Sequence, residues 1–128
     1  MLKMGFKALL GQANAEIDTI SIEEAKRHVG SDDILFIDVR ETQEVEHTGG
    51  IPGHVHVPRG FLEFIADPDS PMHKTALSSG KRLVLYCASG GRSALAAKTL
   101  RDMGINNVCH ISGGYTAWVE SGGPSDTG

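Results

Sequence analysis

A cysteine stands where an apolar run ends and an alanine-rich run begins. Cys87 follows the apolar residues 83–86 and precedes residues 94–100, which are rich in alanine and leucine. The pattern predicts a buried strand that leads into a helix, with the thiol at the helix N-terminus. Backbone N–H groups in the first helical turn lack partners and carry partial positive charge, so a thiolate held there is stabilised. Cys87 is therefore a candidate nucleophile.

The loop after this cysteine has the composition of an anion site. It consists of Ala88, Ser89, Gly90, Gly91, Arg92 and Ser93. The two glycines allow backbone angles that turn N–H groups inward, and Arg92 offers a planar guanidinium that can bind two oxygen atoms. The Ser93 hydroxyl suits the N-cap of a helix. We expect these six residues to bind substrate around Cys87.

Other segments of the chain join this loop in resembling a known family. They are residues 35–41 (Leu-Phe-Ile-Asp-Val-Arg-Glu), 50–53 (Gly-Ile-Pro-Gly), 57–58 (Val-Pro) and 113–118 (Gly-Gly-Tyr-Thr-Ala-Trp). With the Cys-x4-Arg-Ser loop, they make residues 19–122 resemble rhodanese domains, which transfer sulfur. The resemblance implies a three-layer α/β fold, with a central parallel sheet and helices on both faces. It also implies a Cys87 persulfide, with Asp38 and Arg40 in supporting polar contacts near the pocket.

Alternating strands and helices are what the hydrophobic pattern predicts. A short first strand is predicted to end at Ile20, and four further strands are predicted at residues 34–39, 54–57, 82–87 and 107–111. Predicted helices cover residues 21–29, 41–45, 61–66, 73–78, 93–103 and 114–121. Such alternation implies parallel strands with helices on both faces of the sheet. The site then lies at the carboxyl ends of the strands, where Cys87 stands.

The two ends of the chain are predicted to differ from the domain, which covers residues 18–122. Residues 1–17 form a helical arm in this prediction, because apolar residues recur at spacings of three and four; they are Phe6, Leu9, Leu10, Ala13 and Ile17. The apolar run at the start is short and is interrupted by Lys7, so we expect a cytoplasmic protein rather than a signal peptide. Residues 123–128 are polar, and we expect a flexible tail.

Composition excludes several classes of partner. The 128 residues carry a net charge of −4 without a basic run, so we expect no nucleic acid. No apolar stretch approaches about 18 residues, so we expect no membrane span. Two cysteines do not make a disulfide framework, and Cys109 is expected to be a buried, inert thiol. His54 and His56 lack a third ligand, so we expect neither a metal nor another cofactor.

The resemblance implies a sulfurtransferase that takes sulfur from a small donor such as thiosulfate. The acceptor is then a thiol, cyanide or a protein. Family members that use thiosulfate tend to carry more basic residues in the loop, so weak thiosulfate binding is expected here. Two alternatives stay open: a phosphatase or arsenate reductase, whose Cys-x5-Arg loop is one residue longer, and a non-catalytic sulfur carrier or regulatory module.

Overall fold

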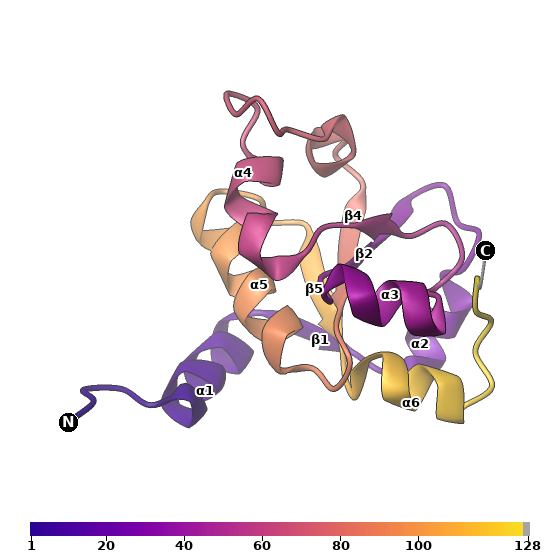
Figure 1. The fold of residues 1–128 in the computed structure, drawn as a ribbon, viewed down its shortest axis with the longest axis horizontal. Coiled ribbons are helices and arrows are strands. Elements are labelled where there is room, and N and C mark those ends of the chain that lie inside the picture. The colour runs from indigo at the N-terminus through magenta and orange to yellow at the C-terminus, as the bar shows by residue number, and fades with distance from the viewer. Residues whose placement is uncertain (127–128) are drawn as a thin grey trace.

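The computed structural model, which describes residues 1–126, is built around one parallel sheet (Figure 1). Its strands are β1 (Asp18–Ile20), β2 (Ile34–Asp38), β3 (Val55–His56), β4 (Arg82–Tyr86) and β5 (Val108–Ile111). They lie in the order β1-β5-β4-β2-β3, and every neighbouring pair is parallel. β4 is in the middle, so Cys87, which follows it, comes out at the centre of the carboxyl edge.

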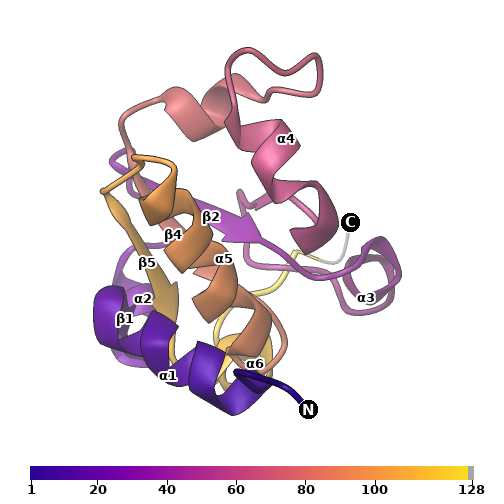
Figure 2. The same ribbon diagram turned by 90° about the vertical axis from the view of Figure 1, so that its left-hand side faces the viewer.

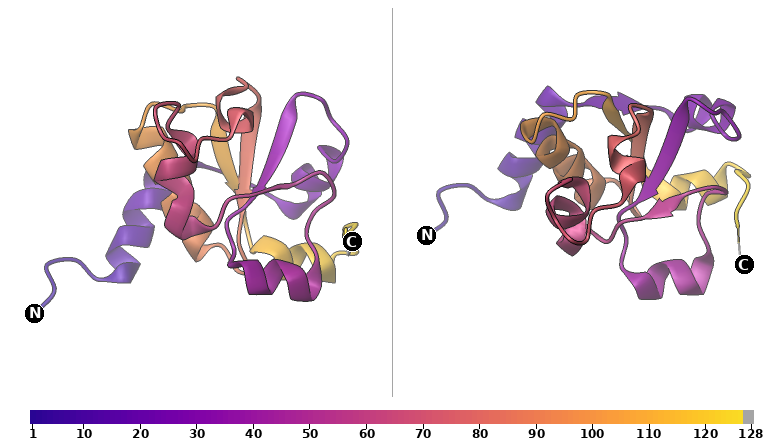
Figure 3. Two further views of the ribbon diagram at one scale, coloured as in Figure 1. Left: turned by 45° about the horizontal axis from the view of Figure 1, so that its top comes forward. Right: turned by 90° about the horizontal axis from the view of Figure 1, so that it is seen from above.

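Helices cover both faces of this sheet, as predicted. One layer contains α1 (Phe6–Glu16), α4 (Leu62–Ala66) and α5 (Gly91–Asp102), and the other contains α2 (Ile22–Arg27) and α6 (Gly114–Glu120). In Figure 2, α1 and α5 lie in front of the strands. α3 (Thr42–Thr48) follows β2 and lies near α6 at the carboxyl edge (Figure 3). The three-layer α/β fold class is thereby confirmed.

Side chains along β4 point alternately to the two faces of the sheet, and both faces are covered by helices. The strand is therefore a continuous apolar run. Leu83, Leu85 and then Cys87 belong to the buried cluster under α1, α4 and α5. Val84 and Tyr86 belong to the cluster on the other face, with Trp118 of α6. Because helices cover both faces, β4 buries every residue after Arg82 and lacks the polar alternation of a half-exposed strand.

Several element boundaries differ from the sequence prediction. α5 begins at Gly91, two residues earlier than predicted, because Gly90 before it adopts a φ of +117° that favours glycine. The predicted helix at residues 73–78 is a short 3-10 helix, Thr75–Ser78, and a second one, Arg59–Phe61, precedes α4.

The N-terminal helix packs through only part of its predicted apolar face. Ala13 of α1, and Ile17 just after the helix, are buried against the domain, whereas Phe6 and Leu9 are exposed.

The helices of residues 1–126 are too short or too polar to span a lipid bilayer.

Residues 123–126, predicted to be a flexible tail, make contacts with the domain. The Trp118 indole N–H donates to the Pro124 carbonyl at 2.7 Å, and Tyr115 donates to the Ser125 hydroxyl at 2.7 Å. Asp126 and Gly50 exchange backbone hydrogen bonds. Residues 127–128 of that predicted tail lie outside the described residues.

Close packing between α6 and the loop after β4 leads to a first prediction. Gly114 has a φ of +63°, and a Cβ atom there would lie 2.6 Å from the carbonyl oxygens of Cys87 and Ala88. Gly122 has a φ of +82° with open space around it. We expect Gly122→Ala to cost about 1–2 kcal/mol of unfolding free energy through backbone strain. Gly114→Ala adds about 1–3 kcal/mol of overpacking to that strain. Denaturant unfolding of both variants measures the two losses of unfolding free energy. Equal losses would contradict the close approach of Gly114 to the Cys87 and Ala88 carbonyl oxygens.

Candidate active site

The sulfur atom of Cys87 lies within hydrogen-bonding distance of two backbone N–H groups of the loop. Gly90 N is 3.1 Å from it and Ser93 N is 3.4 Å from it. Gly90 immediately precedes α5, and Ser93 lies in the first turn of this 12-residue helix. Cys87 as a whole is only 1% exposed. Both N–H groups can stabilise negative charge on the sulfur, as the sequence predicted for a helix N-terminus.

A second helix N-terminus binds the other side of the same loop. The backbone N–H of Tyr115 donates to the Cys87 carbonyl at 2.8 Å, and that of Thr116 donates to the Ala88 carbonyl at 3.1 Å. These two carbonyl oxygens are therefore satisfied by α6 and cannot turn toward an anion at the sulfur. Gly114 is what allows α6 to come this close.

Glu44 of α3 fills the guanidinium fork of Arg92. The Nη1 atom donates to Oε2 at 2.7 Å and Nη2 donates to Oε1 at 2.9 Å. Hydrogen bonds from Arg92 lower the pKa of Glu44 to about 2, so the pair is charged throughout the neutral range. The same carboxylate accepts a hydrogen bond from the Glu41 backbone in a capping box at the start of α3. The predicted anion-binding role of Arg92 stays a prediction, and any anion must share this cation with Glu44.

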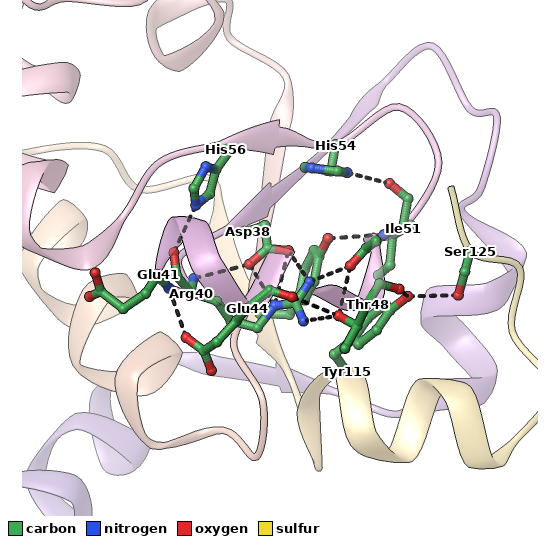
Figure 4. Close-up of polar contacts among 12 residues, drawn as sticks. Asp38, Arg40, Glu41, Glu44, Thr48, Ile51, His54, His56, Tyr115 and Ser125 are labelled. Atoms are coloured by element: carbon green, nitrogen blue, oxygen red, sulfur yellow. Dashed lines mark hydrogen bonds and ion pairs between the residues drawn. The ribbon is translucent and has the colours of Figure 1, made fainter. Parts of the chain in front are cut away.

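Asp38 and Arg40 form a buried ion pair next to this edge (Figure 4). Arg40 donates to Asp38 from Nε and Nη2, to the Thr48 hydroxyl from Nη1 at 2.8 Å, and to the Gly49 carbonyl from Nη2 at 2.7 Å. Its guanidinium also lies 4.3 Å from the centre of the Tyr115 ring. Burial alone would lower the pKa of Arg40, but Asp38 outweighs it and the pKa is raised. The pair joins β2, α3 and α6.

The two histidines considered as metal ligands are bound to backbone carbonyls (Figure 4). His54 Nδ1 lies 2.8 Å from the Ile51 carbonyl oxygen, and His56 Nε2 lies 2.7 Å from that of Arg40. Over the range 1–126, no group of three or more His, Cys, Asp or Glu residues is placed to hold a metal ion.

The other loop residues differ in their exposure. Ser89 is exposed, whereas Ala88, Gly90 and Gly91 are partly buried and Ser93 is fully buried. Gly91 has an ordinary negative φ, so Gly90 is the loop glycine that requires its special conformation. The Ser93 hydroxyl does not cap α5 in the usual way: it lies 3.6 Å from the Cys87 sulfur and 3.3 Å from the Gly90 carbonyl oxygen.

Besides Glu44, a second residue at the site, His110, was not predicted from the sequence. His110 of β5 is 4% exposed, and its Nδ1 atom lies 2.9 Å from the Ser93 hydroxyl oxygen. Burial lowers the pKa of His110. The only signal in the sequence was a histidine within an otherwise apolar strand, which does not reveal its partner.

Comparison with known proteins identifies the family. The model of the rhodanese-like domain matches residues 21–121. The chain therefore belongs to the rhodanese-like domain family, and the resemblance inferred from its motifs is confirmed.

Relatives of the chain carry several descriptions. The thiosulfate:glutathione sulfurtransferase of Saccharomyces cerevisiae is 34% identical over 116 residues, which cover 85% of this chain and 83% of the yeast protein. The proposed sulfur carrier protein YrkF of Bacillus subtilis is 35% identical over 106 residues, or 82% of this chain, but the chain spans only 52% of YrkF. A solved structure from Rhodopseudomonas palustris, RPA3614, matches with a TM-score of 0.95 at 44% identity, covering 98% of this chain and 97% of that one. RPA3614 is described as a protein of unknown function and possible tyrosine phosphatase.

The two cysteines of the chain should differ sharply in reactivity. Burial raises the pKa of Cys109 to about 11, whereas the Cys87 sulfur is next to two N–H groups. We expect dilute iodoacetamide at pH 6.5 to label Cys87 at least about tenfold faster than Cys109, because the thiolate is the reactive form. Peptide mass spectrometry over time measures both rates. Equal rates would mean that the helix N-terminus does not activate Cys87.

Proposed function

We propose that this protein is a sulfurtransferase that carries a sulfane sulfur on Cys87. The observation that carries the proposal is the position of its sulfur, within 3.1 and 3.4 Å of two backbone N–H groups at the start of α5. The yeast relative and a relative from Allochromatium vinosum are both named as sulfurtransferases, which supports this choice within the family.

The proposed reaction has two steps, both at sulfur. The Cys87 thiolate attacks the outer sulfur atom of a donor such as thiosulfate; a new S–S bond forms, the S–S bond of thiosulfate breaks, and sulfite leaves with its electron pair. The Cys87 persulfide anion then lies among the N–H groups of residues 88–93, which stabilise it as an oxyanion hole stabilises oxygen. A thiol, cyanide or a protein acceptor removes the outer sulfur and regenerates the thiolate.

The charge around Cys87 bears on the choice of sulfur donor. Arg92 is the cation of the loop, and Glu44 already neutralises it through two hydrogen bonds. A dianion such as thiosulfate must therefore compete with a carboxylate for the guanidinium. We propose that thiosulfate is a slow donor and that a small persulfide, with less charge, is a faster one. Both cysteines are free thiols, which fits a reducing compartment such as the cytoplasm.

A phosphatase is the second candidate because of the likeness to RPA3614. Two features count against it. The loop from Cys87 to Arg92 has four intervening residues, which leaves fewer N–H groups to surround three equatorial oxygens, and the guanidinium that would bind two of those oxygens is paired with Glu44. A non-catalytic sulfur carrier is the third candidate.

The mass of the intact protein after incubation with a sulfur donor separates these candidates. With thiosulfate or a small persulfide, and excess donor removed, we expect a gain of one sulfur atom that cyanide reverses. Cys87→Ser should show no gain, because a serine hydroxyl without a base is not a comparable nucleophile. Cys109→Ser is the matched control and should gain the sulfur normally.

Other outcomes of the same assay identify the alternatives. Rapid, Cys87-dependent hydrolysis of an aryl phosphate without a stable persulfide would replace the proposal with a phosphatase. A persulfide that forms but is not passed to cyanide or thiols would favour the non-catalytic carrier.

The charge of Glu44 gives a further prediction for thiosulfate. Glu44→Gln removes the negative charge opposite Arg92, while the glutamine can still accept the hydrogen bond from the Glu41 backbone. We expect kcat/KM for thiosulfate to rise about fivefold, on the scale of a partly exposed ion pair. Glu46→Gln, on the exposed face of the same helix, removes an equal charge and should change little. A fall in kcat/KM for Glu44→Gln would mean that Glu44 assists the reaction instead of competing with thiosulfate.

A further inference from the structure

A line of three buried side chains leads from the candidate nucleophile into the protein. The Cys87 sulfur lies 3.6 Å from the Ser93 hydroxyl oxygen, which lies 2.9 Å from His110 Nδ1. They come from the end of β4, the first turn of α5 and β5. All three residues are at most 4% exposed, so water does not compete for these contacts.

The second ring nitrogen of His110 shows which way this line is oriented. His110 Nε2 is buried and has no hydrogen-bond partner in the part of the chain that the structure describes. If Nε2 carried the ring proton, a buried N–H donor would be left unpaired, which native proteins rarely tolerate. The tautomer with the proton on Nδ1 leaves only a bare lone pair at Nε2. In that tautomer His110 donates to the Ser93 hydroxyl oxygen.

The hydroxyl proton of Ser93 is then free to serve one of two acceptors. One is the Gly90 carbonyl oxygen at 3.3 Å, and the other is the Cys87 sulfur. While Cys87 is a thiol, its S–H can donate to the hydroxyl oxygen and the hydroxyl can donate to Gly90. When the sulfur is ionised, a charge-assisted hydrogen bond from the hydroxyl to the sulfur is the stronger choice. A hydroxyl rotates readily between two such acceptors.

We propose that His110 is a positioning residue that directs the Ser93 hydroxyl to the ionised sulfur of Cys87. The hydroxyl becomes the third hydrogen-bond donor to the thiolate and to the persulfide, beside the two backbone N–H groups. The persulfide part rests on the proposed function, whereas the thiolate part does not.

The electrostatic surroundings fit a neutral His110 in this role. Burial lowers its pKa, so the ring stays neutral in the working range and does not store the thiol proton. Arg92 of α5, which is paired with Glu44 of α3, is a charged group that interacts with Cys87. Both are kept in every variant below, so changes in Cys87 reactivity report on the Ser93 and His110 contacts.

The test measures how fast iodoacetamide alkylates Cys87 as a function of pH. Ser93→Ala removes the hydroxyl, and we expect alkylation at pH 6.5 to slow about fivefold, with the pH midpoint displaced upward. His110→Leu leaves the hydroxyl undirected, and we expect about a threefold loss. His110→Asn places an amide N–H near the position of Nδ1 and should restore most of the rate. In the double variant, His110→Leu should add nothing to Ser93→Ala, because His110 acts through Ser93.

A matched control and a second comparison keep the test decisive. His73→Leu removes a histidine from the segment between α4 and β4, where its ring nitrogens contact the Ile65 carbonyl and the Ser78 hydroxyl and not the Cys87 loop, so it should leave the alkylation profile unchanged. If His110→Leu does not fold, His110→Asn is compared with His110→Gln, whose amide is displaced toward the Nε2 position. The proposal requires faster alkylation in the asparagine variant.

Specific results would overturn the proposal. They are a wild-type profile in folded His110→Leu, an equal rate in the asparagine and glutamine variants, or losses that simply add in the double variant. Alkylation needs no sulfur donor, so a protein that forms no persulfide would defeat the proposed function and leave this test intact. Normal persulfide formation in the wild-type protein, together with a wild-type alkylation profile in folded His110→Leu, would defeat this proposal and leave the proposed function intact.

Discussion

The buried pair of Asp38 and Arg40 is the interaction on which the carboxyl edge of the sheet depends. Arg40 contacts the end of β2, the last residue of α3, the Gly49 carbonyl and the Tyr115 ring. Removing one partner of such a pair leaves an uncompensated buried charge, which typically costs about 3–5 kcal/mol. The C-terminal end of α3 is thus anchored by Arg40, and its N-terminal end presents Glu44 to Arg92. Arg40, which follows β2, thus fixes α3, and α3 in turn fixes the position of the Arg92 guanidinium through Glu44.

Two helix N-termini divide the polar groups of the Cys87 loop between them. α5 supplies N–H groups on the side of the sulfur, and α6 binds the carbonyl oxygens of Cys87 and Ala88. Because α6 provides hydrogen-bond donors for the buried carbonyl oxygens, the N–H groups of the loop can point toward the sulfur without leaving those carbonyls unpaired. This arrangement directs two backbone N–H groups toward the sulfur although the chain as a whole is acidic.

Local pattern was enough to predict the layers of the fold and to place Cys87 at the mouth of a helix, because strand, loop and helix follow one another in the chain. It could not reveal Glu44 as the partner of Arg92, 48 residues away, or His110 as the partner of Ser93, 17 residues away. These pairs exist only because the parallel sheet brings the carboxyl ends of β2, β4 and β5 together. Phe6 and Leu9 show the opposite limit: their spacing correctly predicts a helix, but the domain buries only the later part of α1.

The two thiols of the chain lie on opposite faces of one sheet. Cys87 belongs to the cluster under α5, and Cys109 to the cluster under α6. A cysteine that is oxidised to a sulfenic acid is commonly rescued by a neighbouring thiol that closes a disulfide. The body of the sheet stands between the only two candidates in this sequence, so Cys87 has no internal resolving partner. Recovery from peroxide damage must come from a thiol outside the chain.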